Sequence, residues 1–120
     1  MRSSSLPGLL LLLCVPFVFA AAQNINGDKG NSKIILENNK VKVTQYTSPA
    51  NHDVCGKGMH SHPAHLTIIL TEAIVAVKLP DGKSVQQKAP AGTCFWSEAE
   101  THEVINTGKE PVKIQLVELK

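Results

Sequence analysis

Short runs of apolar and β-branched residues alternate with turn residues along most of this chain. Valine, isoleucine, leucine and threonine are concentrated in these runs, and no long window shows the 3.6-residue repeat of an amphipathic helix. The pattern therefore predicts strands and no long helix. The predicted strands cover residues 34–36, 40–47, 66–70, 74–79, 84–88, 93–96, 102–106 and 112–119.

The second of these runs shows the alternation of a half-buried strand. Val41, Val43 and Gln45 share one face, and Lys42 and Thr44 take the other. About eight such short strands within roughly 100 residues predict a sandwich or a barrel, and closing the sheet leaves few open edges that could aggregate. We therefore expect a small all-β barrel.

Two turn signals join the later strands. Asp81-Gly82, in "LPDGKS", predicts a hairpin with a type I′ turn, because that turn needs two residues that tolerate positive φ. The sequence "NTGKEP", residues 106–111, predicts another turn.

The N-terminal 22 residues have the features of a cleavable signal peptide. One early positive charge, Arg2, precedes an apolar run over residues 9–19, and Ala20 to Ala22 provide the small residues for cleavage. An uncleaved membrane span is the alternative, but the run is shorter than the ~20 residues that a span needs, Pro16 interrupts it and Pro7 lies just before it. Residues 23–32, "QNINGDKGNS", predict a flexible lead-in, so the domain is expected at 33–120. We expect an exported protein, periplasmic or secreted, without stable membrane insertion.

Composition and charge exclude several function classes. The chain has 120 residues, enough for one domain. Its formal charge of +2 falls to about +1 once Arg2 is removed, which is too small to suggest a nucleic-acid partner. Phosphate-binding GxxxxGK and GxGxxG motifs and a GxSxG nucleophile elbow are absent from the sequence. Cys55 and Cys94 remain after cleavage, either as a disulfide or as two buried thiols.

Three histidines, His60, His62 and His65, lie immediately before a predicted strand. If the segment is extended, His60 and His62 leave the same face of the sheet, and His65 follows a proline that re-aims the chain. His102 could add an imidazole from across a barrel. Imidazole nitrogen binds zinc, copper, iron and nickel well, so the cluster predicts a metal site, with a solvated loop as the alternative. His52 is outside this spacing and is expected at the surface.

These residues resemble the cupin superfamily. The resemblance rests on "HSHP" from His60, on the strand "LTIILTEAIVAVKLPDGK", and on "AGTCFWSEAETHEVINTG" and "VKIQLVELK". The segments are similar to small single-domain bacterial cupins, particularly the β-alanine-degradation group, and cover nearly all of the mature domain. The resemblance implies an all-β double-stranded β-helix, or jelly-roll barrel. It also implies a metal held by two histidines and a glutamate of a first motif and one histidine of a second.

By this resemblance, His60 and His62 match the paired histidines of the first motif and His102 matches the histidine of the second. Asn106 follows His102 at the H-x3-N spacing of the second motif. The first motif lacks its glutamate, and His65 occupies that place. The resemblance thus implies metal ligation by His60, His62, His65 and His102, with iron, manganese, zinc, nickel and copper all left open as the metal.

Several neighbouring residues are candidates for secondary roles. Glu100 has the strand parity of His102, so it is either a partner of that histidine and a proton acceptor or a solvated turn carboxylate. Phe95 and Trp96 are expected on opposite faces, one packing inside the barrel. Cys94 shares a face with Trp96 and is a minor candidate for a further soft ligand.

The expected function is metal-assisted chemistry, of an oxygenase or an isomerase or hydrolase type, on a small anionic molecule. The anion is expected because neutral imidazoles leave the +2 charge of a metal uncompensated. The alternatives are a non-catalytic periplasmic module that binds a metal or a small ligand, and a barrel without a metal. The resemblance also implies a homodimer.

Overall fold

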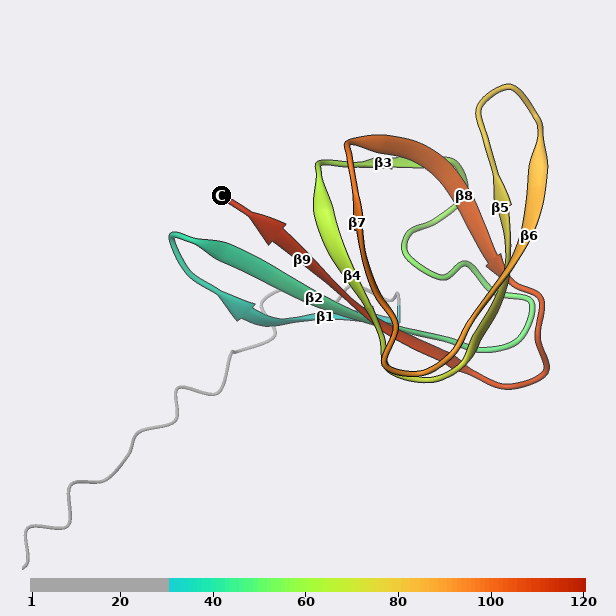
Figure 1. Ribbon diagram of the computed structural model, residues 1–120, viewed down its shortest axis with the longest axis horizontal. Coiled ribbons are helices and arrows are strands. Elements are labelled where there is room, and N and C mark those ends of the chain that lie inside the picture. Colours follow the sequence, from blue (N-terminus) through green and yellow to red (C-terminus); the bar gives the residue numbers. More distant parts are fainter. Residues whose placement is uncertain (1–30) are drawn as a thin grey trace, which may run out of the picture.

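The computed structural model describes residues 31–120 (Figure 1). The predicted signal peptide, residues 1–22, and most of the predicted lead-in lie outside the described residues. Asn31 and Ser32, the last two residues of that lead-in, belong to the folded part: Ser32 begins a strand, and the Asn31 carbonyl accepts a 2.7 Å hydrogen bond from the backbone N–H of Thr47. Within the described part of the chain, no helix is long and apolar enough to span a bilayer.

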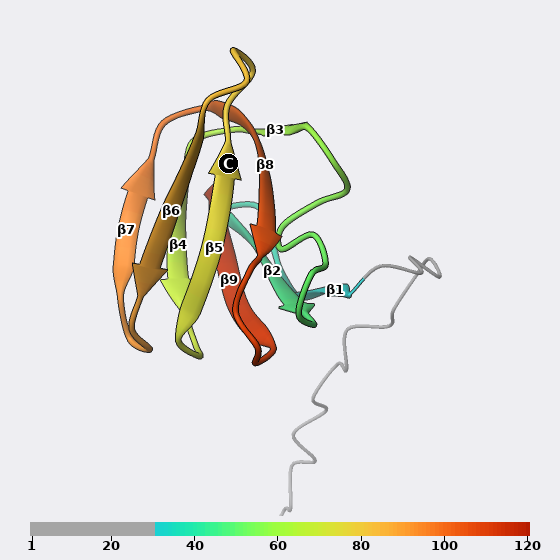
Figure 2. The same ribbon diagram turned by 90° about the vertical axis from the view of Figure 1, so that its right-hand side faces the viewer.

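The described residues form two antiparallel sheets that pack face to face as a flattened barrel (Figures 1 and 2). One sheet has the order β1-β2-β9-β4-β7 and the other β3-β8-β5-β6. The strands are β1 Ser32–Glu37, β2 Val41–Ser48, β3 His60–His62, β4 His65–Ile69, β5 Ala73–Lys78, β6 Ser84–Ala89, β7 Cys94–Ser97, β8 Glu100–Asn106 and β9 Val112–Leu119. The predicted all-β fold is confirmed, and each predicted strand region contains a strand.

The hairpin between β5 and β6 is confirmed, but its predicted type I′ turn is wrong. The N–H of Gly82 donates to the carbonyl of Leu79 at 2.9 Å, and Gly82 has φ +88° whereas Asp81 does not have positive φ. This is the pattern of a type I turn followed by a left-handed glycine. Pro80 favours it, because proline fixes the φ that the first central residue of a type I turn requires.

The core lies between the two sheets. Alternate residues of β4, β5, β8 and β9 point inward, as the period of two in a strand requires. Their burial removes apolar surface from water, which stabilises the fold by about 25 cal/mol per Å². The buried cluster consists of Val54, Cys55, Ile69, Ala73, Val75, Val104, Val112, Ile114 and Leu116.

Asn106 connects three segments at the end of β8. It is fully buried, and its side-chain amide donates to the carbonyls of Ser48 at 3.0 Å and Glu110 at 2.8 Å. Its side-chain carbonyl accepts the N–H of Gly108 at 3.0 Å. A buried amide with these partners satisfies backbone groups that the turn after β8 would otherwise leave unpaired.

Candidate metal centre

Strand pairing places two of the sequence-predicted histidines opposite each other. β3 is antiparallel to β8, with His60 opposite His102 and His62 opposite Glu100. The segment around His60 is therefore extended, which was the condition for His60 and His62 to share a face. Residues opposite one another in an antiparallel pair have neighbouring side chains. The His60 and His102 ring centroids are 5.0 Å apart, and those of His60 and His62 are 4.6 Å apart.

The loop before β3 adds a cysteine to these histidines. The N–H of Val54 donates to the carbonyl of Val104 at 2.9 Å, which holds the loop against β8 and points Cys55 inward. Gly56 follows with φ +148°, and a Cβ there would lie 2.9 Å from Cγ of His60. A glycine is therefore required for the His60 ring to pack against this loop.

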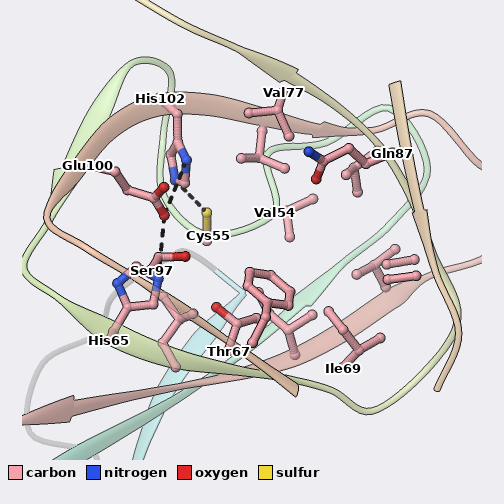
Figure 3. A pocket seen from close by; sticks show the side chains of 18 residues that line it. Val54, Cys55, His65, Thr67, Ile69, Val77, Gln87, Ser97, Glu100 and His102 are labelled. Carbon is pink, nitrogen blue, oxygen red and sulfur yellow. Dashed lines mark hydrogen bonds and ion pairs between the residues drawn. The ribbon is translucent and has the colours of Figure 1, made fainter. Parts of the chain in front are cut away.

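Four ligand atoms converge in this arrangement. Cys55 Sγ is 3.4 Å from His60 Nε2 and 3.5 Å from His102 Nε2, and Figure 3 shows Cys55 pointing at the His102 ring. Together with one ring nitrogen of His62, these atoms all lie within 4.8 Å of one another. Zinc bound tetrahedrally by sulfur at about 2.3 Å and by nitrogen at about 2.0–2.1 Å separates those two ligand atoms by about 3.5–3.6 Å. The observed spacings match that separation.

Polar contacts at Nδ1 of His60 and His102 leave the Nε2 atoms of both rings available. His60 Nδ1 donates to the Gly58 carbonyl at 2.8 Å, and His102 Nδ1 lies 3.6 Å from Oε1 of Glu100. Metal-binding histidines are held by such partners, which fix the tautomer and the ring orientation. His62 Nε2 is buried and has no hydrogen-bond partner among the described residues. An unpaired buried nitrogen costs about 1–3 kcal/mol, and a metal ion at this place would remove that cost, so the residues fit a metal.

Burial controls the protonation of these groups. Burial, and then the neighbouring charges of His60, His102 and His65, lowers the pKa of His62 to about 4. Burial also lowers the pKa of His102, although the nearby Glu100 opposes that shift. Burial, with Glu100 and Asp53 adding to it, raises the pKa of Cys55 to about 12. Near neutral pH the two imidazoles are therefore unprotonated, as metal ligation requires, whereas the thiol must lose a proton before it can bind a metal.

His65 is buried beside this cluster, with an exposed fraction of 2%. Its Nδ1 donates to the Pro63 carbonyl at 2.7 Å, and its Nε2 lies 3.5 Å from Oε1 of Glu100. The His65 and His62 ring centroids are 5.2 Å apart. His65 is not one of the four converging groups, and its ligation of a metal stays a prediction.

Glu100 lies between two imidazoles and is not a solvated turn carboxylate. The same oxygen is 3.5 Å from His65 and 3.6 Å from His102, while 35% of the side chain is exposed (Figure 3). Of the two readings of Glu100, the partner of His102 is the one that this geometry supports. His52 is exposed, as predicted.

Of the two alternatives for the cysteines, unlinked thiols are observed and the disulfide is not, and Cys55 is buried as that alternative expected. Its expectation for Cys94 is wrong, because Cys94 is exposed with its Sγ 3.8 Å from the Gly92 carbonyl. Cys94 faces outward with Trp96, because Phe95, between them, points into the barrel opposite Thr67. The thiol near the imidazoles is Cys55. Its position immediately before "GKGMHSH" was the only sequence signal that could have suggested this.

A cavity of about 240 Å³ adjoins the cluster inside the barrel (Figure 3). Cys55, His65, Glu100 and His102 line one end of it, and the rest of the wall is mainly apolar. Since Cys55 and His102 belong to the converging group, a molecule in this cavity would lie next to a metal bound there.

Comparisons with known proteins identify the fold. No protein-family model matches the sequence, and no curated protein matches it either. Among solved structures, a cupin domain from Bordetella pertussis matches with a TM-score of 0.68 and 24% identity, covering 76% of this chain and 93% of that one. A double-stranded β-helix protein from Klebsiella pneumoniae matches with a TM-score of 0.56 and 17% identity, over 84% and 87% of the two chains. The polyketide cyclase RemF from Streptomyces resistomycificus matches with a TM-score of 0.57 and 14% identity, over 73% and 63%.

The chain therefore has the cupin fold, with small bacterial cupins among its structural neighbours, and carries a buried cysteine–histidine cluster suited to a metal. The resemblance to the β-alanine-degradation group gains no support from these comparisons.

Proposed function

We propose that this protein binds one divalent transition metal through Cys55, His60, His62 and His102 and carries out metal-assisted chemistry on a small molecule in the adjoining cavity. The convergence of the four ligand atoms, with His62 Nε2 buried and unpaired, is the observation that supports the metal. The donor set favours zinc, copper or iron over manganese, because thiolate and imidazole are softer ligands than carboxylate.

The chemistry that a bound metal supplies is polarisation of a substrate oxygen or activation of water or dioxygen. Side chains of this protein supply proton transfer and exclude water. His65 and Glu100 are placed to hold or pass a proton at the cavity wall, since Glu100 Oε1 lies 3.5 Å from His65 Nε2. The apolar wall excludes water, which strengthens electrostatic interactions at this end of the cavity.

The proposal is tested by metal titration and elemental analysis of the protein. We expect the protein to bind one metal ion per chain. Replacing His60 and His62 together by alanine should abolish this binding. His52→Ala is the matched control, because His52 is exposed and stands apart from the cluster. A protein that binds no metal at micromolar concentration, or a double variant that binds it undiminished, would contradict the proposal.

A non-catalytic metal-binding module is the second candidate. Four protein ligands complete a tetrahedral zinc site, and closed sites of this kind are structural whereas catalytic sites keep an open position. Oxygen uptake or substrate turnover by the metal-loaded protein supports catalysis. Bound metal that is shielded from small anions such as azide, without turnover of any substrate tested, supports the module.

Export follows from the predicted signal peptide, and we include it in the proposal. Mature protein from its native compartment should begin near Gln23, and N-terminal sequencing measures this directly. An N-terminus at Met1 would contradict export by this route.

A homodimer is also part of the proposal. Within the described strands β1 lies at a sheet edge and pairs with β2 alone, and Ile34 and Leu36 are exposed on it. Exposed apolar edge strands favour association with another strand. Light scattering should give a dimer for the native chain and a monomer for Leu36→Lys, and a monomeric native chain would contradict this expectation.

A further inference from the structure

The cavity beside the candidate metal centre has a polar end and an apolar body. In Figure 3, His65, Glu100, His102 and Cys55 gather at one end, and Gln87 lies away from them across an apolar region. The apolar wall is contributed by strands of both sheets and includes Ile69, Val75, Val77, Val104, Ile114 and Leu116.

The volume of the cavity limits the size of its ligand. A dry cavity of about 150 Å³ is sufficient to bind benzene. At about 240 Å³, this cavity can hold one substituted ring or a branched chain of similar size. A larger molecule would have to displace side chains of the core.

The charges along the wall limit the chemistry of the ligand. Among residues 31–120, no lysine or arginine lines the cavity, so a negative charge in the apolar body would be buried without a partner. Among the described residues of the wall the carboxylate is Glu100, which faces His65 and His102, so a second anionic group on the ligand would find no positive partner. A divalent ion bound by three neutral imidazoles and one thiolate keeps one positive charge, which matches a single anionic group.

The apolar body of the cavity also offers few hydrogen-bonding partners for a ligand. Away from the metal end, the hydrogen-bonding side chains that the described part of the chain places on the wall are those of Thr67, Gln87 and Ser97. A sugar or an amino acid would bury several hydroxyl groups or an ammonium group, and each one left without a hydrogen-bond partner would weaken binding. The wall therefore disfavours polyhydroxylated and zwitterionic molecules.

We infer that the cavity binds a small monoanion with a compact apolar body, whose single carboxylate, phenolate or enolate group lies at the metal end. This inference rests on the proposed metal site. Entry is from the side where β6 and β7, the edge strands of the two sheets, are not paired with each other. Gln87 of β6 and Phe95 of β7 both line the cavity and are exposed, Phe95 by 43%, so they stand where the cavity meets the surface.

The test compares three probes that differ by one charged group, using the zinc-loaded full-length protein and calorimetry. Phenylacetate has one anionic group and an apolar ring, phenylglycine adds an ammonium group, and para-carboxyphenylacetate adds a carboxylate at the far end. We expect phenylacetate to bind at least about tenfold more tightly than either analogue, since tenfold corresponds to about 1.4 kcal/mol, the lower end of the cost of one unpaired polar group. Equal affinity for the three probes, or no binding of phenylacetate, would overturn the inference.

Variants that fill the cavity test whether phenylacetate binds inside it. Ala89→Trp and the milder Val77→Phe fill the apolar body and should weaken phenylacetate binding at least about tenfold without changing zinc stoichiometry. Ser84→Trp, on the outer face of β6, is the matched control and should leave binding unchanged. Unchanged binding in both filled variants would overturn the inference.

Zinc stoichiometry, measured on the same samples, separates this inference from the proposed function. A chain that binds no zinc contradicts both. A chain that binds zinc but does not prefer phenylacetate contradicts only the ligand class. Equal phenylacetate affinity with and without zinc would overturn the placement of the anionic group at the metal end.

Discussion

Cys55 Sγ lies 3.5 Å from Nε2 of His102, although 47 residues separate them in the sequence. The loop that carries Cys55 is bound to β8 through the hydrogen bond between Val54 and Val104, so the thiol and the imidazole are brought together by the same strand. This contact adds Cys55 to the residues that could hold a metal, whereas the fourth ligand that the sequence implies is His65.

Replacing Cys55 should change the metal site more than replacing His65. In the cobalt-substituted protein we expect a sulfur-to-cobalt charge-transfer absorption that Cys55→Ser abolishes, because only a thiolate ligand gives that band. His65→Ala should keep the band, and Cys94→Ser is the control for the exposed thiol. If His65→Ala lowers the metal stoichiometry and Cys55→Ser does not, His65 is the ligand and the assignment of Cys55 is wrong.

Zinc binding near pH 7 should release about one proton, because the buried Cys55 thiol, with a pKa of about 12, must become a thiolate in order to bind. His62 and His102 have lowered pKa values and are already neutral at this pH. Calorimetry in buffers of different ionisation enthalpy measures the number of protons released. Cys55→Ser should release nearly none, and equal release by the two proteins would show that the proton comes from another group.

The metal-free protein should lose stability as the pH falls from about 6.5 to about 4. Unfolded histidine has a pKa near 6.5 whereas His62 has about 4, so the unfolded chain binds more protons in this window and protonation favours unfolding. The contribution of His62 is fully present above pH 6.5, and at pH 4.5 about 2 kcal/mol of it is lost.

Urea unfolding in the presence of a chelator measures this dependence, and His62→Leu is the comparison. The difference in the free energy of unfolding between native chain and variant should change by about 2 kcal/mol between pH 7 and 4.5. A difference that is independent of pH would show that His62 does not titrate across this window.

Glu100→Gln should weaken metal binding without removing a ligand. The glutamine side chain cannot match the charge that the carboxylate presents to His102 Nδ1 at 3.6 Å, and outer partners of this kind contribute about 10–100-fold to metal affinity. Competition with a chelator measures the affinity. Glu103→Gln, one residue past His102 and on the other face of β8, is the matched control, and an equal loss in both variants would argue for a general charge effect.

Asn106→Ala should destabilise the fold much more than Asn38→Ala. Asn106 is buried and bonds to Ser48, Glu110 and Gly108, so its removal leaves buried backbone groups unpaired and should cost about 2–4 kcal/mol. Asn38 Oδ1 accepts hydrogen bonds from the backbone N–H groups of Lys40 and Val41 in an exposed turn, where water can replace it. Asn38→Ala should therefore lower the free energy of unfolding by less than about 1 kcal/mol. Chemical denaturation compares the two, and similar losses would show that Asn106 does not connect the segments as described.

The sequence by itself determined the strands and much of the histidine cluster. Strand periodicity depends on residues close together in the chain, so the predicted strand regions and the shared face of His60 and His62 could be derived from spacing alone. The number of short strands predicted the barrel, and the resemblance to cupins added its double-stranded β-helix topology, which the structural neighbours share. His102, which the sequence suggested as a further imidazole, lies with His60 and His62 in the cluster that could hold a metal.

Only the tertiary structure brought Cys55 to the imidazoles and gave the cavity its shape. The choice between Cys55 and Cys94 depended on which loop packs against β8, and the inward position of Phe95 depended on the register of β7 with β4. The contact of Glu100 with His65 depended on how β4 and β8 face each other across the barrel. These contacts join residues far apart in the chain, and their geometry is set by the pairing and packing of whole strands, which local spacing does not encode.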